Sequence, residues 1–414
     1  MESSINKFCC YFVLTYSLLP ILSVFQSNIF FEIVYVAAIL LWIVTGLTGL
    51  IAFYRKKMLL PYVFFISIVI LYMIVGYGNL NLATAICYAL LFGIAVNGCL
   101  YITKPNKKFD KRLFVYLTIL YLITLISTIG VLSTDSLAAR ILTSSSSDPD
   151  AVNAYKLKNV GSFDFIYSLL LLIPMIGGFI KASFFKSRGN ALIFVGFQIL
   201  MIVCVIMSNF TTALILLFVD IMLLLLIGRE KMTLSKFVFM SVVVMVLAPA
   251  MLIFFIQQMV SLTDSIYAAD KLTGLLAASA GSEDVGEVYT RTDQIKASVN
   301  SFLSNPIFGV GGWYPISGVP NPKIGYHSQF LDEFARYGLI GAGPLLLFFR
   351  NIFSVIYKQN GNKEFYKNLV FAPLLLFTIL SFLNPVFDNI MMISIFIYVP
   401  LVDRVIRYEN IIYS

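Results

Sequence analysis

The chain has 414 residues, of which 59% are hydrophobic and only 12% are charged. Soluble domains carry about twice that share of charged residues, so the composition excludes an ordinary soluble protein and indicates one that spans a membrane repeatedly. The formal net charge is +8. Because the basic residues fall between apolar runs, this charge reflects membrane topology and gives no reason to expect a nucleic-acid partner.

Twelve apolar runs approach the length of helix that crosses a bilayer, which is about 17 to 25 residues. They predict an all-α polytopic membrane protein with about 12 transmembrane helices. The first run has no small-residue cleavage site after it, so we expect a retained helix and not a signal peptide. The predicted spans are residues 9–25, 29–53, 58–76, 82–103, 113–133, 162–180, 190–207, 211–228, 237–256, 337–357, 368–384 and 389–402.

Lysine and arginine predict the orientation of these spans, because short cytoplasmic loops are enriched in both. With both termini in the cytoplasm, most of the 29 basic residues fall in the inner segments. The five cysteines lie within or at the edges of the spans and show no metal-ligand spacing. We therefore predict no metal site and no disulfide framework.

The outer loops divide the chain into three parts. Residues 1–256 contain nine spans and a medium loop at 133–161, residues 257–336 form a large outer loop, and residues 337–414 contain three spans and a cytoplasmic tail. Long connections in compact proteins are usually functional or disordered. The mixed composition of the second loop predicts that it is ordered and partly helical.

The medium loop carries three cations, Arg140, Lys156 and Lys158. The outer side of a membrane protein is normally poor in positive charge, so these side chains are candidates for binding an anionic substrate. A mobile, solvated loop would have the same composition. Asp220 differs, because it lies near the middle of the eighth span, where a carboxylate is costly and is expected to be functional or paired.

In the large loop, Thr290-Arg291-Thr292-Asp293 fits the start of a capping box and predicts a helix that stops at Asn305-Pro306. Arg291 would then lie in the first helical turn. Free backbone N–H groups, the helix dipole and a guanidinium would together hold a phosphate there. The alternative is a surface arginine on an ordinary helix. Three glycines in Pro306–Trp313 permit close approach of the backbone to a partner, although a linker would serve equally well.

His327 is the only histidine of the chain and precedes a predicted helix that continues into the tenth span. Histidine is the side chain best suited to proton transfer near neutral pH. Packing is the alternative role, because His327, Leu331 and Phe334 share one face of that helix. Arg336 also has a simpler interpretation, since Asp332 lies one turn earlier at the spacing of a surface ion pair.

These residues resemble the large periplasmic loop of O-antigen polymerases (Wzy) and O-antigen ligases (WaaL). The shared elements are Arg291 opening a helix, Asn305-Pro306-Ile307-Phe308-Gly309-Val310-Gly311, His327, Leu331 and Gly338-Leu339-Ile340-Gly341. The layout of twelve spans, with the long loop before the last three, extends the resemblance to the whole chain.

One element departs from the ligase pattern. Ligases commonly carry a Ser-Arg-Thr-like element where this chain reads Ser208-Asn209-Phe210-Thr211-Thr212, so the arginine is absent. This favours a polymerase, or it transfers the role of that charge to Arg140, Lys156 or Lys158.

The resemblance implies a GT-C-like fold and a metal-independent glycosyltransferase in the bacterial inner membrane, without a cofactor. It would join oligosaccharide repeat units carried on undecaprenyl pyrophosphate at the periplasmic face, for O-antigen or capsule, with a Wzz-type chain-length regulator and a flippase as expected partners. His327 would be the general base, and Arg291 would stabilise the pyrophosphate. The residues assigned to the pyrophosphate are Arg291, Arg140, Lys156, Lys158 and Arg336, and those assigned to the acceptor are Tyr326 and Trp313.

Three alternatives remain at this stage. A ligase would transfer the glycan to lipid A core. A flippase or other transporter would need polar residues distributed through the membrane core, where Asp220 is the main deeply placed charge. A membrane scaffold would give no purpose to the arrangement of Arg291 and His327.

Overall fold

The computed structural model describes residues 4–51, 56–79, 82–142, 148–183, 188–226, 286–314, 320–358 and 364–410. Across these ranges the chain is helical, with no strand and one isolated bridge between Trp313 and Pro320. The predicted all-α class is confirmed.

The helices of the first half are α1 (Ser4–Leu18), α2 (Pro20–Ser23), η1 (Val24–Ser27), α3 (Ile29–Ile51), α4 (Lys56–Ile74), α5 (Leu82–Thr103), α6 (Lys107–Leu132), α7 (Ala138–Ile141), α8 (Pro149–Leu157), α9 (Phe163–Ser183), α10 (Arg188–Met207) and α11 (Thr211–Leu226). They are followed by α14 (Gly286–Ser304), α15 (Gln329–Lys358), α16 (Glu364–Leu383), α17 (Asn389–Ile393), the π-helical turn η2 (Ser394–Tyr398) and α18 (Val399–Asn410).

Seven helical segments among the described residues are long and apolar enough to cross a membrane. They are Ile29–Gly49, Ala83–Thr103, Lys107–Leu132, Phe163–Ser183, Arg188–Met207, Gln329–Lys358 and Asn389–Tyr408. Shorter apolar helices, Leu59–Ile74, Thr211–Ile221 and Asn368–Leu383, coincide with three further predicted spans. The polytopic character is confirmed. The count of twelve stays a prediction, because span 237–256 lies outside the described residues.

The first predicted span, 9–25, is not one continuous helix. α1 ends at Leu18, and Leu19 is extended with φ −106° and ψ 100° before Pro20 begins α2. The proline ring clashes with a helical conformation of the preceding residue, which explains the interruption.

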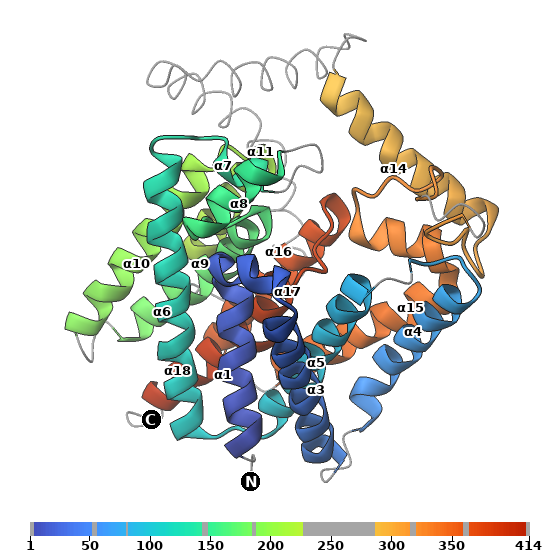
Figure 1. Cartoon of the computed structure of the whole chain (residues 1–414). Helices are drawn as coiled ribbons and strands as arrows, with labels where there is room; N and C mark the ends of the chain where they lie inside the picture. Colours follow the sequence, from blue (N-terminus) through green and yellow to red (C-terminus); the bar gives the residue numbers. More distant parts are fainter. Residues whose placement is uncertain are drawn as a thin grey trace.

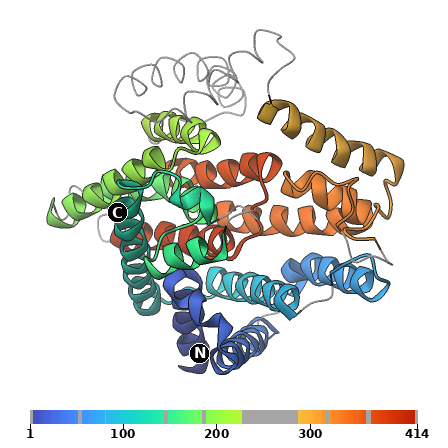
Figure 2. The ribbon, with the colours of Figure 1, turned by 45° about the horizontal axis from the view of Figure 1, so that its top comes forward.

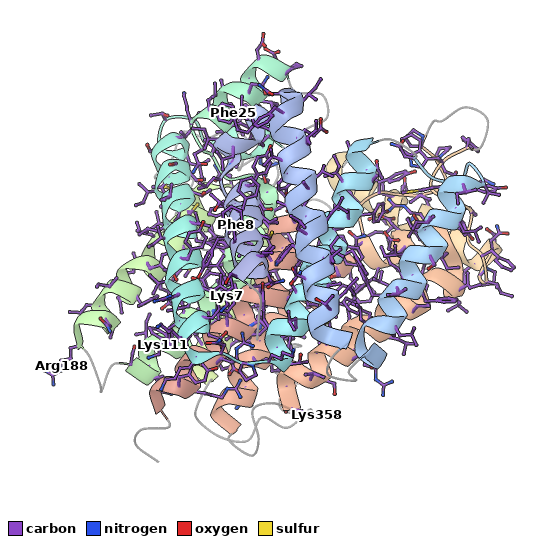
Figure 3. The ribbon with its side chains drawn as sticks, turned by 60° about the horizontal axis from the view of Figure 1, so that its bottom comes forward. Lys7, Phe8, Phe25, Lys111, Arg188 and Lys358 are labelled. Atoms are coloured by element: carbon purple, nitrogen blue, oxygen red, sulfur yellow. The ribbon has the colours of Figure 1, made fainter. Side chains whose placement is uncertain are left out.

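The two ends of the chain lie at one end of the helical bundle, whereas α7, α8 and α14 lie at the opposite end (Figure 1). Viewed with the first end forward, Lys7, Lys111, Arg188 and Lys358 gather there, and Phe25 lies away from them (Figure 3). All four basic residues belong to segments that the sequence predicts to be cytoplasmic. Their common location agrees with the prediction that both termini lie on the same side of the membrane.

The centre of the bundle is α9. Every side chain from Phe165 to Ile176 is buried, and α9 packs against α10, α11, α16 and α18. A helix that is apolar on all sides belongs in a core and not at a lipid boundary. The start of this helix therefore holds a fixed place at the end of the bundle that carries α7, α8 and α14.

α15 is broken at Gly338, where the backbone adopts φ 58° and ψ −162°. An unbroken helix would join the N–H groups of residues 339 and 340 to the carbonyls of residues 335 and 336. Residues 306–311, here called the glycine loop, bond all four groups instead. The bonds are Val310 N–H to Ala335 O (2.8 Å), Gly311 N–H to Arg336 O (3.0 Å), Leu339 N–H to Pro306 O (2.8 Å) and Ile340 N–H to Ile307 O (3.1 Å).

The glycines allow this close contact between two backbones. A Cβ atom at Gly338 would lie 2.2 Å from the carbonyl oxygen of Ile307, and one at Gly309 would lie 2.4 Å from that of Arg336. Both glycines also have positive φ. The sequence predicts that the backbone at these glycines approaches a partner closely. That partner is the broken part of α15 in the same chain.

Gly338→Ala should lower the free energy of unfolding by about 3 kcal/mol or more, because the backbone conformation is nearly exclusive to glycine and the added methyl group meets a carbonyl. Thermal unfolding in detergent measures this loss. Gly343→Ala is the matched control on the same helix, since nothing lies within 4 Å of a Cβ there. A Gly338→Ala protein as stable as Gly343→Ala would contradict the role of the break.

Candidate functional site

His327 lies in a short turn, residues 324–328, here called the histidine turn, which leads into α15. The side chain of His327 is half-buried. Tyr326, just before it, has a positive φ of 56°, and its hydroxyl donates to the Gly312 carbonyl at 2.6 Å. Ser328, just after it, is buried, and its hydroxyl accepts the N–H of Leu331 at 3.4 Å. The backbone on both sides of the histidine is thus held by hydrogen bonds.

α14 packs directly against the histidine turn. A Cβ at Gly325 would lie 2.1 Å from the carbonyl oxygen of Gln294, so the two backbones touch. About two turns further along α14, the hydroxyl of Ser301 donates to the Lys323 carbonyl at 2.6 Å. Gln294 is three positions beyond Arg291, so the helix that carries the predicted phosphate ligand contacts the turn that carries the predicted base.

The predicted position of Arg291 in the helix is wrong. α14 ends at Ser304, as expected, but it begins at Gly286 and not near Thr290. Glu287, Val288 and Tyr289 extend the helix by one turn at its start. Position 291 therefore lies beyond the first turn, and its own N–H is not one of the free groups at the helix end. The side chain of Arg291 is outside the described part of the structure, and its distance from His327 stays a prediction.

Arg336 is paired with Glu333 and not with Asp332, so the alternative ion pair expected from the sequence is wrong. Its Nη1 lies 3.1 Å from Oε1 of Glu333, which is only 3% exposed and also accepts the amide of Gln329 at 2.8 Å. The Arg336 guanidinium lies 5.0 Å from the ring centroid of Tyr326. Arg336 thereby ties α15 to the histidine turn.

The predicted acceptor contacts, Tyr326 and Trp313, come together. Trp313 directly follows Gly312, whose carbonyl accepts the Tyr326 hydroxyl. The side chain of Trp313 is half-buried, and its backbone N–H donates to the carbonyl of Tyr77 at 3.1 Å. Burial raises the pKa of Tyr326, and the nearby charge of Arg336 opposes that shift, so the phenol stays protonated near neutral pH.

The sequence did not predict a contact between residues 384–388 and the start of α15, which directly follows the histidine turn. The side-chain oxygen of Gln329 accepts the N–H groups of Val386 and Phe387, both at 3.1 Å. Asp388 follows and caps α17 by accepting the N–H of Ile390 at 2.8 Å. Burial raises the pKa of Asp388, whose carboxyl interacts electrostatically with that of Asp164 in the first turn of α9. The sequence does show that Asp164 and Asp388 each lie at the start of an apolar span, and this pattern could have marked them as candidates.

The side chain of Arg140 lies against residues 209 and 210, which belong to the segment that departs from the ligase pattern. Its Nη2 donates to the carbonyl of Asn209 at 2.6 Å, and its guanidinium lies 5.1 Å from the ring centroid of Phe210. The other two predicted cations lie on or next to α8. Lys156 is half-buried, whereas Lys158 is exposed with its Nζ 5.8 Å from the Tyr155 ring.

The start of α9 connects the Arg140 region with the histidine turn. Phe210 packs against Phe163 and Tyr167 of α9, with ring centroids 5.8 and 6.1 Å apart. Asp164, between these two aromatic residues, interacts with Asp388 in the loop that Gln329 binds. α17 also packs against α9, and α14 lies alongside α15 in both ribbon views (Figures 1 and 2). The two predicted cation groups thus belong to one connected end of the bundle.

The arrangement offers cations, carboxylates and one imidazole at the end opposite the termini. Within the described ranges, no group of three or more His, Cys, Asp or Glu side chains is arranged to hold a metal ion. Asp220 of α11 is fully buried, and neither carboxyl oxygen hydrogen-bonds to any described residue. Its predicted pairing is therefore not observed in this part of the chain.

Residues 196–346 match the model of a protein family described as O-antigen ligase (Wzy_C). No curated protein matches the sequence. The matched region includes α11, α14, the glycine loop, the histidine turn and the broken start of α15.

Tyr326→Phe should lower the free energy of unfolding by about 1 kcal/mol, because it removes the hydrogen bond to Gly312 but keeps the ring beneath Arg336. Tyr326→Ala should cost about 2 kcal/mol, since the cation–π contact is lost as well. Thermal unfolding checks this order, with the exposed Tyr314→Phe as control. If Tyr326→Phe and Tyr326→Ala unfold together, the contact with Arg336 adds nothing.

Proposed function

We propose that this chain, which belongs to the O-antigen polymerase and ligase family through the domain at residues 196–346, is a polymerase. It joins oligosaccharide repeat units carried on undecaprenyl pyrophosphate. The observation that carries the proposal is the contact of α14 with the histidine turn at Gly325 and Gln294. This contact brings the segments of Arg291 and His327 together at the end opposite the termini.

In the proposed reaction, a hydroxyl oxygen of the acceptor sugar attacks the anomeric carbon of the donor sugar. The bond from that carbon to the pyrophosphate oxygen breaks, and the pyrophosphate leaves with the bonding electrons. His327 accepts the proton of the hydroxyl. Arg291 and Arg140 stabilise the negative charge that grows on the leaving group, so they act more strongly on the transition state than on the ground state.

The two arginines near the site, Arg336 and Arg140, have different described contacts. Arg336 is neutralised by Glu333 at 3.1 Å. Arg140 contacts the carbonyl of Asn209 and the ring of Phe210. We assign Arg140 as the cation that assists Arg291, because it lies against residues 209 and 210, whereas the ion pair with Glu333 makes Arg336 mainly a structural residue. Lys156 and Lys158 stay proposed ligands of the pyrophosphate.

The proposed location is the bacterial inner membrane, with both termini in the cytoplasm and the histidine turn in the periplasm. The gathering of Lys7, Lys111, Arg188 and Lys358 at the end of the termini supports this orientation (Figure 3). Labelling of single cysteines at Lys158 and Lys358 from either side of the membrane tests it. A chain-length regulator and a flippase are proposed partners.

The second candidate is an O-antigen ligase. Arg140 favours it, because its guanidinium contacts Asn209 and Phe210, where ligases carry their own arginine. Purified protein with defined lipid-linked repeat units separates the two functions, because only a polymerase makes a ladder of products on a gel without lipid A core. Labelled core that becomes glycosylated, without a ladder, would make the chain a ligase. Activity that persists in EDTA is expected in either case.

His327→Ala should abolish ladder formation while the protein remains folded, because the variant removes the proposed base from a half-buried site. Gel ladders and thermal unfolding are measured together. Lys323→Ala, an exposed side chain four positions earlier, is the control and should stay active. Loss of folded protein in His327→Ala would show a packing role, and a normal ladder would exclude His327 as the base.

Arg291→Lys should reduce the polymerisation rate at least about 10-fold, and Arg291→Ala by about 100- to 1,000-fold, if a planar guanidinium stabilises the leaving pyrophosphate. Initial rates with a defined donor measure both. Lys296→Ala on the same helix is the control, because Lys296 is exposed and paired with Asp293 at 3.6 Å. Full activity of Arg291→Lys would mean that a diffuse positive field is sufficient.

A further inference from the structure

A continuous chain of hydrogen bonds surrounds His327 and reaches from α14 to α15. The N–H of Gly325 donates to the Ser298 hydroxyl at 2.9 Å, and that hydroxyl donates to Oδ1 of Asp332 at 2.5 Å. The other carboxyl oxygen of Asp332 accepts the N–H of Ser328 at 3.0 Å. The two ends of this chain, at residues 325 and 328, bracket the histidine.

The members of this chain are deeply buried. Ser298 and Ser328 are each 1% exposed, and Asp332 is 3% exposed. Burying a carboxylate is costly, and apolar residues of similar size often hold a fold as well or better. Arg336 forms its ion pair with Glu333 and not with Asp332. We therefore look for a role of the buried Asp332 carboxylate in fixing the positions of its neighbours, in addition to stability.

Helix register connects the same chain to Arg291. Position 291 lies seven residues before Ser298 on α14, or about two turns, so the two positions share one face of the helix. A bond at Ser298 therefore sets both how far α14 lies from the histidine turn and how it is rotated about its axis. Displacement of about 1 Å between reacting groups costs about 100-fold in rate.

We propose that Ser298 and Asp332 are positioning residues that hold the helix of Arg291 and the turn of His327 in one reactive geometry. The inference rests on the proposed function, because it assigns those two side chains to one reaction. Ser298 and Asp332 do not touch substrate. They act by fixing the backbone on both sides of His327 relative to α14.

α14 offers a matched control. The Ser301 hydroxyl, one turn after Ser298, is also buried and also bonds the loop before α15, but its acceptor is the carbonyl of Lys323. Ser301→Ala therefore removes one hydroxyl of the same kind, from the same helix, without touching Asp332. It should cost a similar amount of stability to Ser298→Ala, because each variant loses one hydrogen bond.

The test compares steady-state polymerisation by the full-length protein. Ser298→Ala should lower kcat about 100-fold with KM for the lipid-linked donor nearly unchanged, whereas Ser301→Ala should keep most of the wild-type rate. Asp332→Asn should resemble Ser298→Ala, and the double variant should be no slower than the slower single variant, because both changes break the same chain. Equal losses in Ser298→Ala and Ser301→Ala, or additive losses in the double variant, would overturn the proposal.

Hydrogen exchange supplies a measurement that does not depend on activity. The peptide containing residues 324–329 should exchange faster in Ser298→Ala, because this variant releases the Gly325 N–H. Its exchange should be unchanged in Ser301→Ala, because that variant releases no N–H. Unchanged exchange in Ser298→Ala would overturn the proposal. If wild-type protein makes no polymer, the proposed function fails, and faster exchange still supports Ser298 as the residue that holds the turn.

Discussion

The break of α15 at Gly338 is the constraint on which the rest of the site depends. A helix at the edge of a membrane cannot leave its N–H and carbonyl groups without partners, because each such group costs several kcal/mol in an apolar medium. The glycine loop takes all four groups that the break releases. This requirement fixes residues 306–311 against α15, and so it also fixes the chain on either side of them.

The consequences of that contact extend in both directions along the chain. Before the loop comes α14, which carries position 291, and after it come Gly312 and Trp313, bound to the carbonyl of Tyr77 near α4. The Gly312 carbonyl in turn accepts the Tyr326 hydroxyl, so the histidine turn is held by the residue that directly follows the glycine loop. A motif that could be understood as a flexible linker therefore acts as a rigid support for the proposed base.

The charged residues at this end of the bundle differ in the groups that they contact. Glu333 compensates Arg336, and the bonds of Asp332 go to Ser298 and Ser328, so both belong to the support of the histidine turn. Arg140 bonds a neutral carbonyl and stacks on Phe210.

Several features followed from the sequence because they depend on local composition. Apolar runs determined the helical, multi-pass class, the turn residues Asn305-Pro306 determined the end of α14, and the apolar positions Phe330 and Phe334 determined a helix that runs into the tenth span. The match of residues 196–346 to the O-antigen ligase family model also followed, because the motif at residues 291–341 lies inside the matched region. Such patterns depend on helix period and on steric preferences of single residues, which short stretches of chain already contain.

Only the tertiary structure decided which groups are partners. Asp332 and Glu333 each lie about one helical turn before Arg336, so the sequence spacing allows either to pair with it. Arg336 pairs with Glu333, whereas Asp332 accepts the hydroxyl of Ser298 from α14, which is distant in sequence. The placement of Arg140 against residues 209 and 210 likewise joins loops 69 positions apart. α14 begins at Gly286, about one turn before the predicted start near Thr290. Long-range contacts such as these are set by packing of whole helices, which no local pattern encodes.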